Sequence, residues 1–196
     1  LGVAALAACS STPESAPTPE QSVATAPMMQ GTPTDIAFAQ SMIPHHQQAI
    51  EMAELALAPQ SGASEQVQEL AQQIKAAQDP EIQQMTQWLQ AWGAPTAMPG
   101  ATDGSGMAGM DHSGHDMGGI AMSGMMTAEQ MQQLQQARGT DFDQMWLTMM
   151  IAHHEGAISM AQQAQASNSS QVTTVTDAII TGQEEEITTM QALLAQ

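Results

Sequence analysis

The chain has very few residues that carry positive charge. Its 196 residues include 2 Lys and Arg together against 20 Asp and Glu, which gives a formal net charge of -18. Because almost nothing basic is present to neutralise phosphates, this balance excludes nucleic acid as a partner. An electrostatic field of this sign attracts cations instead.

Cysteine and aromatic residues are also scarce. The single cysteine, Cys9, has no second thiol with which to pair. With 3 Trp, 2 Phe and no Tyr, a core must be built from Ala, Leu, Ile and the 18 methionines. Methionine packs adaptably, and its thioether is also a soft metal ligand. Each methionine therefore has two interpretations, core packing and metal binding.

Long hydrophobic runs are missing as well, because no stretch reaches the roughly eighteen apolar residues needed to span a bilayer. A short apolar run ends in "LAAC" at residues 6–9 and is followed by small polar residues, which resembles the lipobox of a bacterial lipoprotein. We expect residues 1–9 to be part of a lipoprotein signal peptide, with Cys9 as the lipidated residue. The protein would then be exported and held by lipid at the outer face of the cytoplasmic membrane, or lie in the periplasm. The alternative is a free cysteine at a disordered end.

Nearly the same twelve residues occur twice. "MIPHHQQAIEMA" at residues 42–53 matches "MIAHHEGAISMA" at 150–161, an offset of 108. A second pair, "QDPEIQQMTQWL" at 78–89 and "QEEEITTMQALL" at 183–194, follows at an offset of 105. The two copies therefore differ mainly in the length of the connection between their halves.

Each copy is expected to form two antiparallel helices joined by a loop. Thr32 and Thr140 each precede an acidic residue by three positions, a variant of the capping box that starts a helix. The predicted helices span 33–58 and 64–92 in hairpin one, 127–137 as a short extra helix, and 140–167 and 170–195 in hairpin two. Residues 32–196 are thus expected to form an all-α four-helix bundle made of two repeated helical hairpins, 32–92 and 127–196.

Two prolines interrupt the predicted helices. Pro44 stands where the second copy has Ala152, so we expect the first helix to lose one backbone hydrogen bond and to bend just before His45. Pro80 is expected to break the second helix or to start a new segment of it. Exact symmetry between the two copies is therefore in doubt.

Two segments have compositions that argue against a packed core. Residues 10–31 are rich in Ser, Thr, Pro, Ala and Gln, which predicts a disordered tether. The linker at 93–126 between the hairpins holds nine of the fifteen glycines, seven methionines and two histidines. Glycine at this density prevents a stable helix, and a linker of this length is usually functional or disordered.

The six histidines occur in pairs, and four of them lie in the repeat. Helical periodicity points His46 and His154 into the bundle and places His45 and His153 about 100° away from them. Three pairs have the i, i+4 spacing that brings a thioether to an imidazole: Met42 with His46, Met150 with His154, and Met149 with His153. The alternative is that the histidines are core residues held by hydrogen bonds.

Methionine and neutral histidine together suit Cu(I), or Ag(I) through the same softness. Outside the cytoplasm cysteine thiolates tend to form disulfides, whereas thioethers still bind copper. The linker offers a second ligand set within eleven residues, which is a spacer in the alternative interpretation: Met107, Met110, His112, His115 and Met117. We therefore expect Cu(I) in the bundle, with Cu(II) as a further option at the histidines of the linker.

The partner helices carry a repeated polar set. Gln78, Glu81 and Met85 share one helical face, and Gln183, Glu186 and Met190 repeat it. Gln and Glu would orient the imidazole rings as hydrogen-bond acceptors, and Met85 and Met190 would bind the ion directly. An equally open interpretation is a solvated face with one core methionine in each copy.

The paired "HHQQAIEMA" and "HHEGAISMA", each preceded by Met-Ile and followed by Gln-x-x-Glu-Ile-x-x-Met, resemble a bacterial DUF family of ferritin-like four-helix bundles. The resemblance covers residues 33–196. It implies an exported or periplasmic protein, and copper binding and resistance are implicated for a few members. The motif positions that it carries onto this chain are Met42, His45, His46, Met52, Met150, His153, His154 and Met160.

Three function classes follow. The first is a non-catalytic copper-binding protein for sequestration, tolerance or delivery, with a copper-trafficking protein as its partner. The second is a metal-free helical interaction module of the cell envelope, in which histidine and methionine only pack. The third, a di-metal oxidase, is disfavoured because such bundles use Glu-x-x-His, and neither histidine pair has a glutamate three residues before it.

Overall fold

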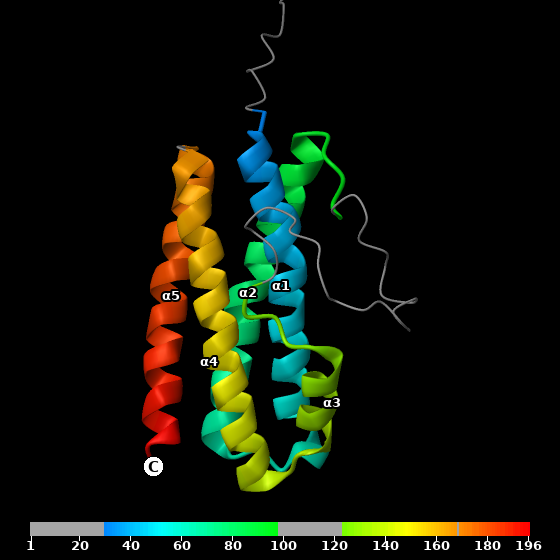
Figure 1. Cartoon of the computed structure of the whole chain (residues 1–196), viewed down its shortest axis with the longest axis vertical. Helices are drawn as coiled ribbons and strands as arrows, with labels where there is room; N and C mark the ends of the chain where they lie inside the picture. The colour runs from blue at the N-terminus through cyan, green and yellow to red at the C-terminus, as the bar shows by residue number, and fades with distance from the viewer. Residues whose placement is uncertain (1–29, 98–122, 168) are drawn as a thin grey trace, which may run out of the picture.

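Four long helices and one short helix make up the described part of the chain, which in this computed structural model is residues 30–97, 123–167 and 169–196 (Figure 1). The helices are α1 (Pro33–Leu57), α2 (Glu65–Ala91), α3 (Ala128–Gln136), α4 (Gly139–Ala164) and α5 (Ser170–Leu194). Short 3-10 turns follow α1 at Pro59–Ser61 and α4 at Gln165–Ser167. Within these ranges there is no strand, so the predicted all-α class is confirmed.

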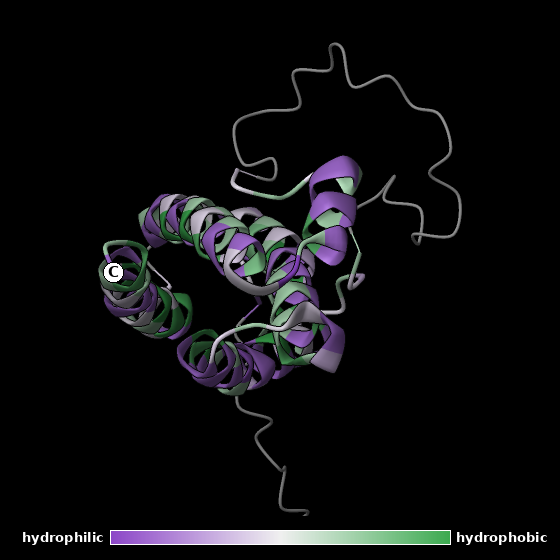
Figure 2. Ribbon diagram, turned by 90° about the horizontal axis from the view of Figure 1, so that it is seen from below, coloured by the Kyte–Doolittle hydropathy of each residue, from purple (hydrophilic) through white to green (hydrophobic). Residues whose placement is uncertain are grey.

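The four long helices form a bundle of two hairpins. α1 packs along α2 and α4 packs along α5, and the hairpins meet mainly through α1 and α4. Viewed along the bundle, the four helices surround a common interior and α3 lies outside them (Figure 2). Both predicted hairpins are confirmed, and each predicted helix boundary lies within three residues of the observed one. Of the helices in the described part, none is long and apolar enough to cross a membrane.

Of the two capping boxes predicted at helix starts, one is present and one is not. Thr32 and Asp35 form the reciprocal capping box at α1, with hydrogen bonds of 3.1 and 2.9 Å. The corresponding prediction for Thr140 is wrong, because α4 begins at Gly139 and has no side-chain cap. The Asp143 carboxylate, its expected partner, instead accepts a hydrogen bond from the Ser64 N–H at 3.2 Å. A contact between hairpins has therefore replaced a local cap.

Replacing Asp143 by alanine should lower the free energy of unfolding by about 1 kcal/mol, because the Ser64 N–H at the start of α2 loses its acceptor. Asp141→Ala is the matched control, since Asp141 is an exposed carboxylate in the same first turn of α4. Urea unfolding followed by circular dichroism measures both variants. Equal losses in the two would mean that the contact between Asp143 and Ser64 contributes nothing specific.

Neither proline interrupts its helix. α1 runs unbroken through Pro44, and α2 runs unbroken through Pro80, so the expected break at Pro80 is wrong. Most of the stability of a helix in a protein comes from packing of its apolar face. The buried residues Ile74 and Met85 anchor α2 on both sides of Pro80, which outweighs one lost backbone hydrogen bond.

The apolar interior is divided into two clusters of buried residues along the bundle. The first, the Phe38 cluster, contains Phe38, Ala39, Met42, Ile43, Met85, Trp88, Leu89, Ala157, Met160, Ala161, Ala164, Val172 and Ile179. The second, the Trp146 cluster, contains Ala49, Met52, Ala53, Ala56, Ala63, Val67, Leu70, Ala71, Ile74, Leu134, Phe142, Trp146, Leu147, Met149, Met150 and Met190. On each long helix the residues of one cluster give way to those of the other near the middle.

Candidate metal centre

A layer of polar residues lies between the two apolar clusters. Each long helix contributes to it at the point where one cluster ends and the other begins. On α1, for example, Ile43 belongs to the Phe38 cluster and Ala49 to the Trp146 cluster. The members of this polar layer are His45, His46, Gln78, Glu81, His153, His154, Gln183 and Glu186. The two copies of the repeat thus bring all their candidate polar residues to one level of the bundle.

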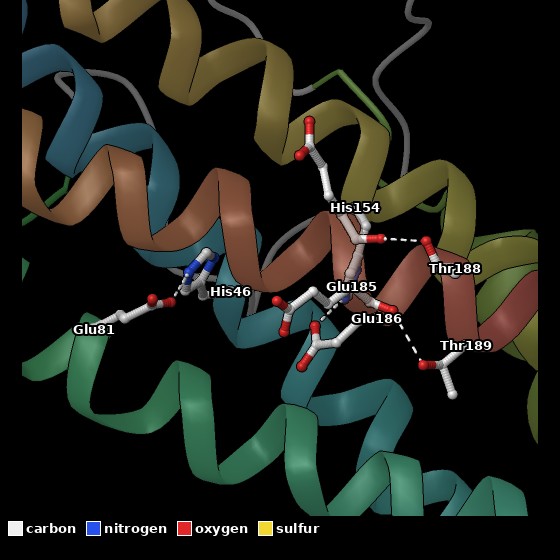
Figure 3. A network of polar contacts seen from close by, with 8 residues as sticks. His46, Glu81, His154, Glu185, Glu186, Thr188 and Thr189 are labelled. Carbon is white, nitrogen blue, oxygen red and sulfur yellow. Dashed lines mark hydrogen bonds and ion pairs between the residues drawn. The ribbon is translucent and has the colours of Figure 1, made fainter.

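In each hairpin, one histidine is paired with a glutamate on the other helix (Figure 3). The Glu81 carboxylate accepts a hydrogen bond from His46 Nε2 at 2.8 Å, and Glu186 accepts one from His154 Nε2 at 2.6 Å. Both imidazoles are fully buried, whereas the glutamate side chains are 21% and 16% exposed. A carboxylate that holds Nε2–H leaves the lone pair of a neutral ring on Nδ1. In the described part, neither Nδ1 atom has a hydrogen-bond partner.

The other two histidines are in contact between the hairpins, with their rings tilted against each other. The ring centroids of His45 and His153 are 3.8 Å apart, with an interplanar angle of 43°. The two residues occupy the same position in the two copies, so their contact must lie close to the approximate two-fold axis of the repeat. Periodicity placed both about 100° from the inward arc, but that side is covered too, because α1 and α4 pack together there. His45 is 0% and His153 1% exposed.

The surroundings of this histidine pair are not symmetric. His45 Nε2–H donates to the Ser123 carbonyl at 3.0 Å, which leaves its Nδ1 without a proton and, among the residues described, without a partner. In the described ranges neither ring nitrogen of His153 makes a hydrogen bond of ordinary geometry, and its one polar neighbour there is the backbone of His45. Most buried polar atoms in proteins are hydrogen-bonded. The three nitrogens of these two adjacent rings that lack a hydrogen bond therefore call for an explanation.

Burial keeps this histidine pair neutral. Loss of hydration lowers the pKa of His45 to about 4, although the hydrogen bond to Ser123 opposes the shift. The pKa of His153 falls to about 2, first through burial and then through repulsion from the imidazoles of His45, His154 and His46, although the backbone of His45 opposes the shift. At neutral pH both rings are therefore uncharged, and their lone pairs are available as metal ligands.

Methionine side chains flank the polar layer on both sides. Five buried methionines lie four residues, or about one helical turn, from a His or Glu of the layer: Met42, Met85, Met149, Met150 and Met190. Met52 and Met160 are also buried, but they lie six residues from the nearest histidine, roughly 9 Å along the helix. The Met52 carbonyl accepts the indole N–H of Trp146 at 2.8 Å, which ties this residue to the apolar core.

The donors present fit a soft cation. Unpartnered neutral imidazole nitrogens and nearby thioethers suit Cu(I) and Ag(I). In residues 30–97, 123–167 and 169–196, no group of three or more His, Cys, Asp or Glu side chains is arranged to hold an ion. A site built from the described residues alone would therefore draw on methionine.

Two predicted site residues do not make the predicted contacts, and others lie outside the described residues. Gln78 and Gln183 are buried in the polar layer, but their amides have no hydrogen-bond partner in the described structure, so they do not orient the imidazole rings as expected. The linker candidates Met107, Met110, His112, His115 and Met117 lie outside the described residues, as do Cys9 and most of the predicted tether.

Two contributors to the site were missed in the sequence. The Ser123 carbonyl contacts His45, and the Gln48 amide holds the backbone of Met126 nearby. A backbone acceptor 78 residues away leaves no side-chain pattern. One signal was present: Gly156 lies inside a predicted helix, and a glycine in such a position often has a packing reason.

Comparison with known proteins gives one family. The model of a domain of unknown function (DUF305) matches residues 35–194. A DUF305 fragment from Deinococcus radiodurans is 27% identical, with a TM-score of 0.69, and covers 85% of this chain and 98% of its own. A DUF305 protein from Streptomyces coelicolor classed as secreted is 28% identical, with a TM-score of 0.68, and covers 83% and 91%.

A third similar structure is CopM in its Cu(II)-bound form. It is 34% identical, with a TM-score of 0.62, and covers 85% of this chain and 98% of its own. CopM structures with Cu(I), with silver and without metal are similar as well. No curated protein sequence matches the chain.

Proposed function

Because this chain belongs to the DUF305 family, we propose that it is a copper-binding protein of the cell envelope that takes up Cu(I) in the polar layer of its bundle. The Cu(I)-bound and silver-bound forms of the similar CopM support this choice of ion, and its Cu(II)-bound form supports copper in general. The formal charge of -18 favours cations near the surface. Export is supported by the similarity to a protein classed as secreted, and attachment through Cys9 remains our prediction.

One observation carries the proposal: among the described residues, both nitrogens of the buried His153 ring and Nδ1 of the adjacent His45 ring lack a hydrogen bond. Leaving a buried polar atom unpaired costs roughly 1–3 kcal/mol. A side chain kept for packing alone would gain nothing from two unpaired polar atoms. A neutral imidazole kept for a metal must present its lone pair in this way.

We place the ion at His45 and His153, with thioethers from the methionines one turn away. Met42, Met149 and Met150 lie on the same two helices as the histidine pair, and the buried Met85 and Met190 lie on α2 and α5, one turn from Glu81 and Glu186. We leave out Met52 and Met160 because they lie nearly two turns from the layer. The Glu81 and Glu186 carboxylates would hold the rings of His46 and His154 as neighbours of the site.

Capture outside the membrane serves sequestration, tolerance or delivery to a copper-trafficking partner. The linker set of Met107, Met110, His112, His115 and Met117 remains a predicted second site that would add capacity, including for Cu(II). No group in this proposal performs a reaction on a substrate, so we propose binding without catalysis.

An anaerobic titration of the chain from Ser10 onward with Cu(I), against a competing chelator, tests the proposal. We expect at least one equivalent of Cu(I) to bind tightly, with Zn(II) binding weakly because thioethers are poor ligands for it. If Cu(I) stays with the chelator, copper binding is refuted. The histidines and methionines would then serve packing, and the metal-free interaction module would take its place.

A further inference from the structure

The segment Ser123–Met126 at the end of the linker is attached to the bundle at the histidine pair. The Ser123 carbonyl accepts the hydrogen bond from His45 Nε2–H at 3.0 Å. Three residues further on, Gln48 binds both backbone groups of Met126. Its Nε2 donates to the Met126 carbonyl at 2.9 Å, and its Oε1 accepts the Met126 N–H at 2.6 Å. One side chain of α1 thus fixes the segment one turn beyond His45.

On the other side, two glycines allow the segment to touch α4. Gly124 has a φ of +82°, which favours glycine, and a Cβ there would collide with the carbonyl oxygen of Ala152. A Cβ on Gly156 would overlap the backbone carbonyl of Ser123 itself. The segment can therefore reach His45 only because both positions lack a side chain.

This attachment decides which nitrogen of His45 is free. A carbonyl oxygen only accepts, so Nε2 must carry the proton, and the lone pair of the neutral ring must be on Nδ1. Without the Ser123 carbonyl, the proton would also occupy Nδ1 and would block that atom as a ligand. His153, the same position in the second copy, makes no such hydrogen bond to an acceptor in the described residues, so this segment holds only one of the two rings.

We propose that Ser123–Met126 sets the tautomer and the orientation of His45, and that Gln48 and Gly156 are positioning residues because they hold this segment in place. The inference rests on the proposed function for its consequence, which is that Nδ1 of His45 is ready to bind a soft ion. Hydrogen-bond partners of metal-binding imidazoles usually change metal affinity by 10- to 100-fold when they are removed.

The test compares Gln48→Ala and Gly156→Ala with matched controls. Gln47→Ala changes an exposed glutamine beside Gln48, and Gly182→Ala changes a helical glycine whose added Cβ would meet nothing within 4 Å. Circular dichroism checks that each variant folds. The first readout is the ring nitrogen NMR spectrum of the metal-free, histidine-labelled protein, and the second is Cu(I) affinity by chelator competition.

In the parent and in both controls, His45 should show the Nε2–H tautomer alone. Gln48→Ala and Gly156→Ala should show a second tautomer of His45 and a Cu(I) dissociation constant raised 10- to 100-fold. An unchanged tautomer in folded Gln48→Ala would overturn the inference, whether or not copper binds. A changed tautomer with unchanged affinity would overturn the positioning role. If the parent does not bind Cu(I), the proposed function fails, while the tautomer readout still decides whether this segment orients His45.

Discussion

Replacing His153 by leucine should stabilise the metal-free protein and at the same time abolish tight Cu(I) binding. The change removes two buried nitrogens that have no partner in the described structure, so we expect the free energy of unfolding to rise by about 1–3 kcal/mol. The dissociation constant for Cu(I) should increase by more than about 100-fold. Losing a metal ligand should reduce metal affinity more than losing a hydrogen-bond partner of a ligand, which typically reduces it 10- to 100-fold.

His154→Leu is the matched control for this result. His154 is the next residue on α4 and is equally buried, but its Nε2 hydrogen-bonds to Glu186 at 2.6 Å. Leucine at this position leaves the Glu186 carboxylate without its partner, so the free energy of unfolding should fall by about 1–3 kcal/mol. Two neighbouring histidines are therefore expected to show effects of opposite sign on the stability of the metal-free protein.

Urea unfolding in the presence of a chelator measures the stabilities, and anaerobic chelator competition measures the affinities. If both leucine variants lose stability to a similar extent and retain Cu(I), then His153 is a packing residue. In that case the free nitrogens of the His45 and His153 pair do not form the site that we propose.

The sequence was sufficient for the helices because their signals are local. The repeat, the capping box at Thr32 and the loops place each boundary within a few residues. The exception at Thr140 arises because Asp143 forms a contact with Ser64, 79 residues away. The predicted break at Pro80 is wrong for a similar reason, since packing on both sides of it is a property of the assembled bundle.

The site was predictable in part. Spacing alone indicated the pairs of methionine and histidine one turn apart, and the repeated Gln-x-x-Glu indicated partners for the rings. The contact between His45 and His153 could not be predicted, because it depends on how α1 packs against α4. The Ser123 carbonyl could not be predicted either, because every residue has a carbonyl and only the fold selects one of them.

The metal-free protein should also lose stability steeply below about pH 6.5. In this range His45 and His153 bind protons in the unfolded state but stay neutral in the folded state. The pKa of His45 is lowered from 6.5 to about 4, and that of His153 from 6.5 to about 2. The contribution of these neutral rings is therefore complete above pH 6.5 and is lost progressively as the pH falls toward the folded-state values. Each proton difference contributes about 1.4 kcal/mol per pH unit.

With both rings counted, the free energy of unfolding should fall by up to about 3 kcal/mol per pH unit on the acid side of pH 6. Charged neighbours also act on the protonation of this pair. His46 and His154 repel a proton on either ring, and the Glu81 and Glu186 carboxylates face His46 and His154. Urea unfolding at about pH 7, 6 and 5 in the presence of a chelator gives the slope. His153→Leu should remove about half of it, because one of the two titrating rings is gone. A stability that is level across this range would mean that the two imidazoles are not neutral because of burial, and the description of their pairing would have to be abandoned.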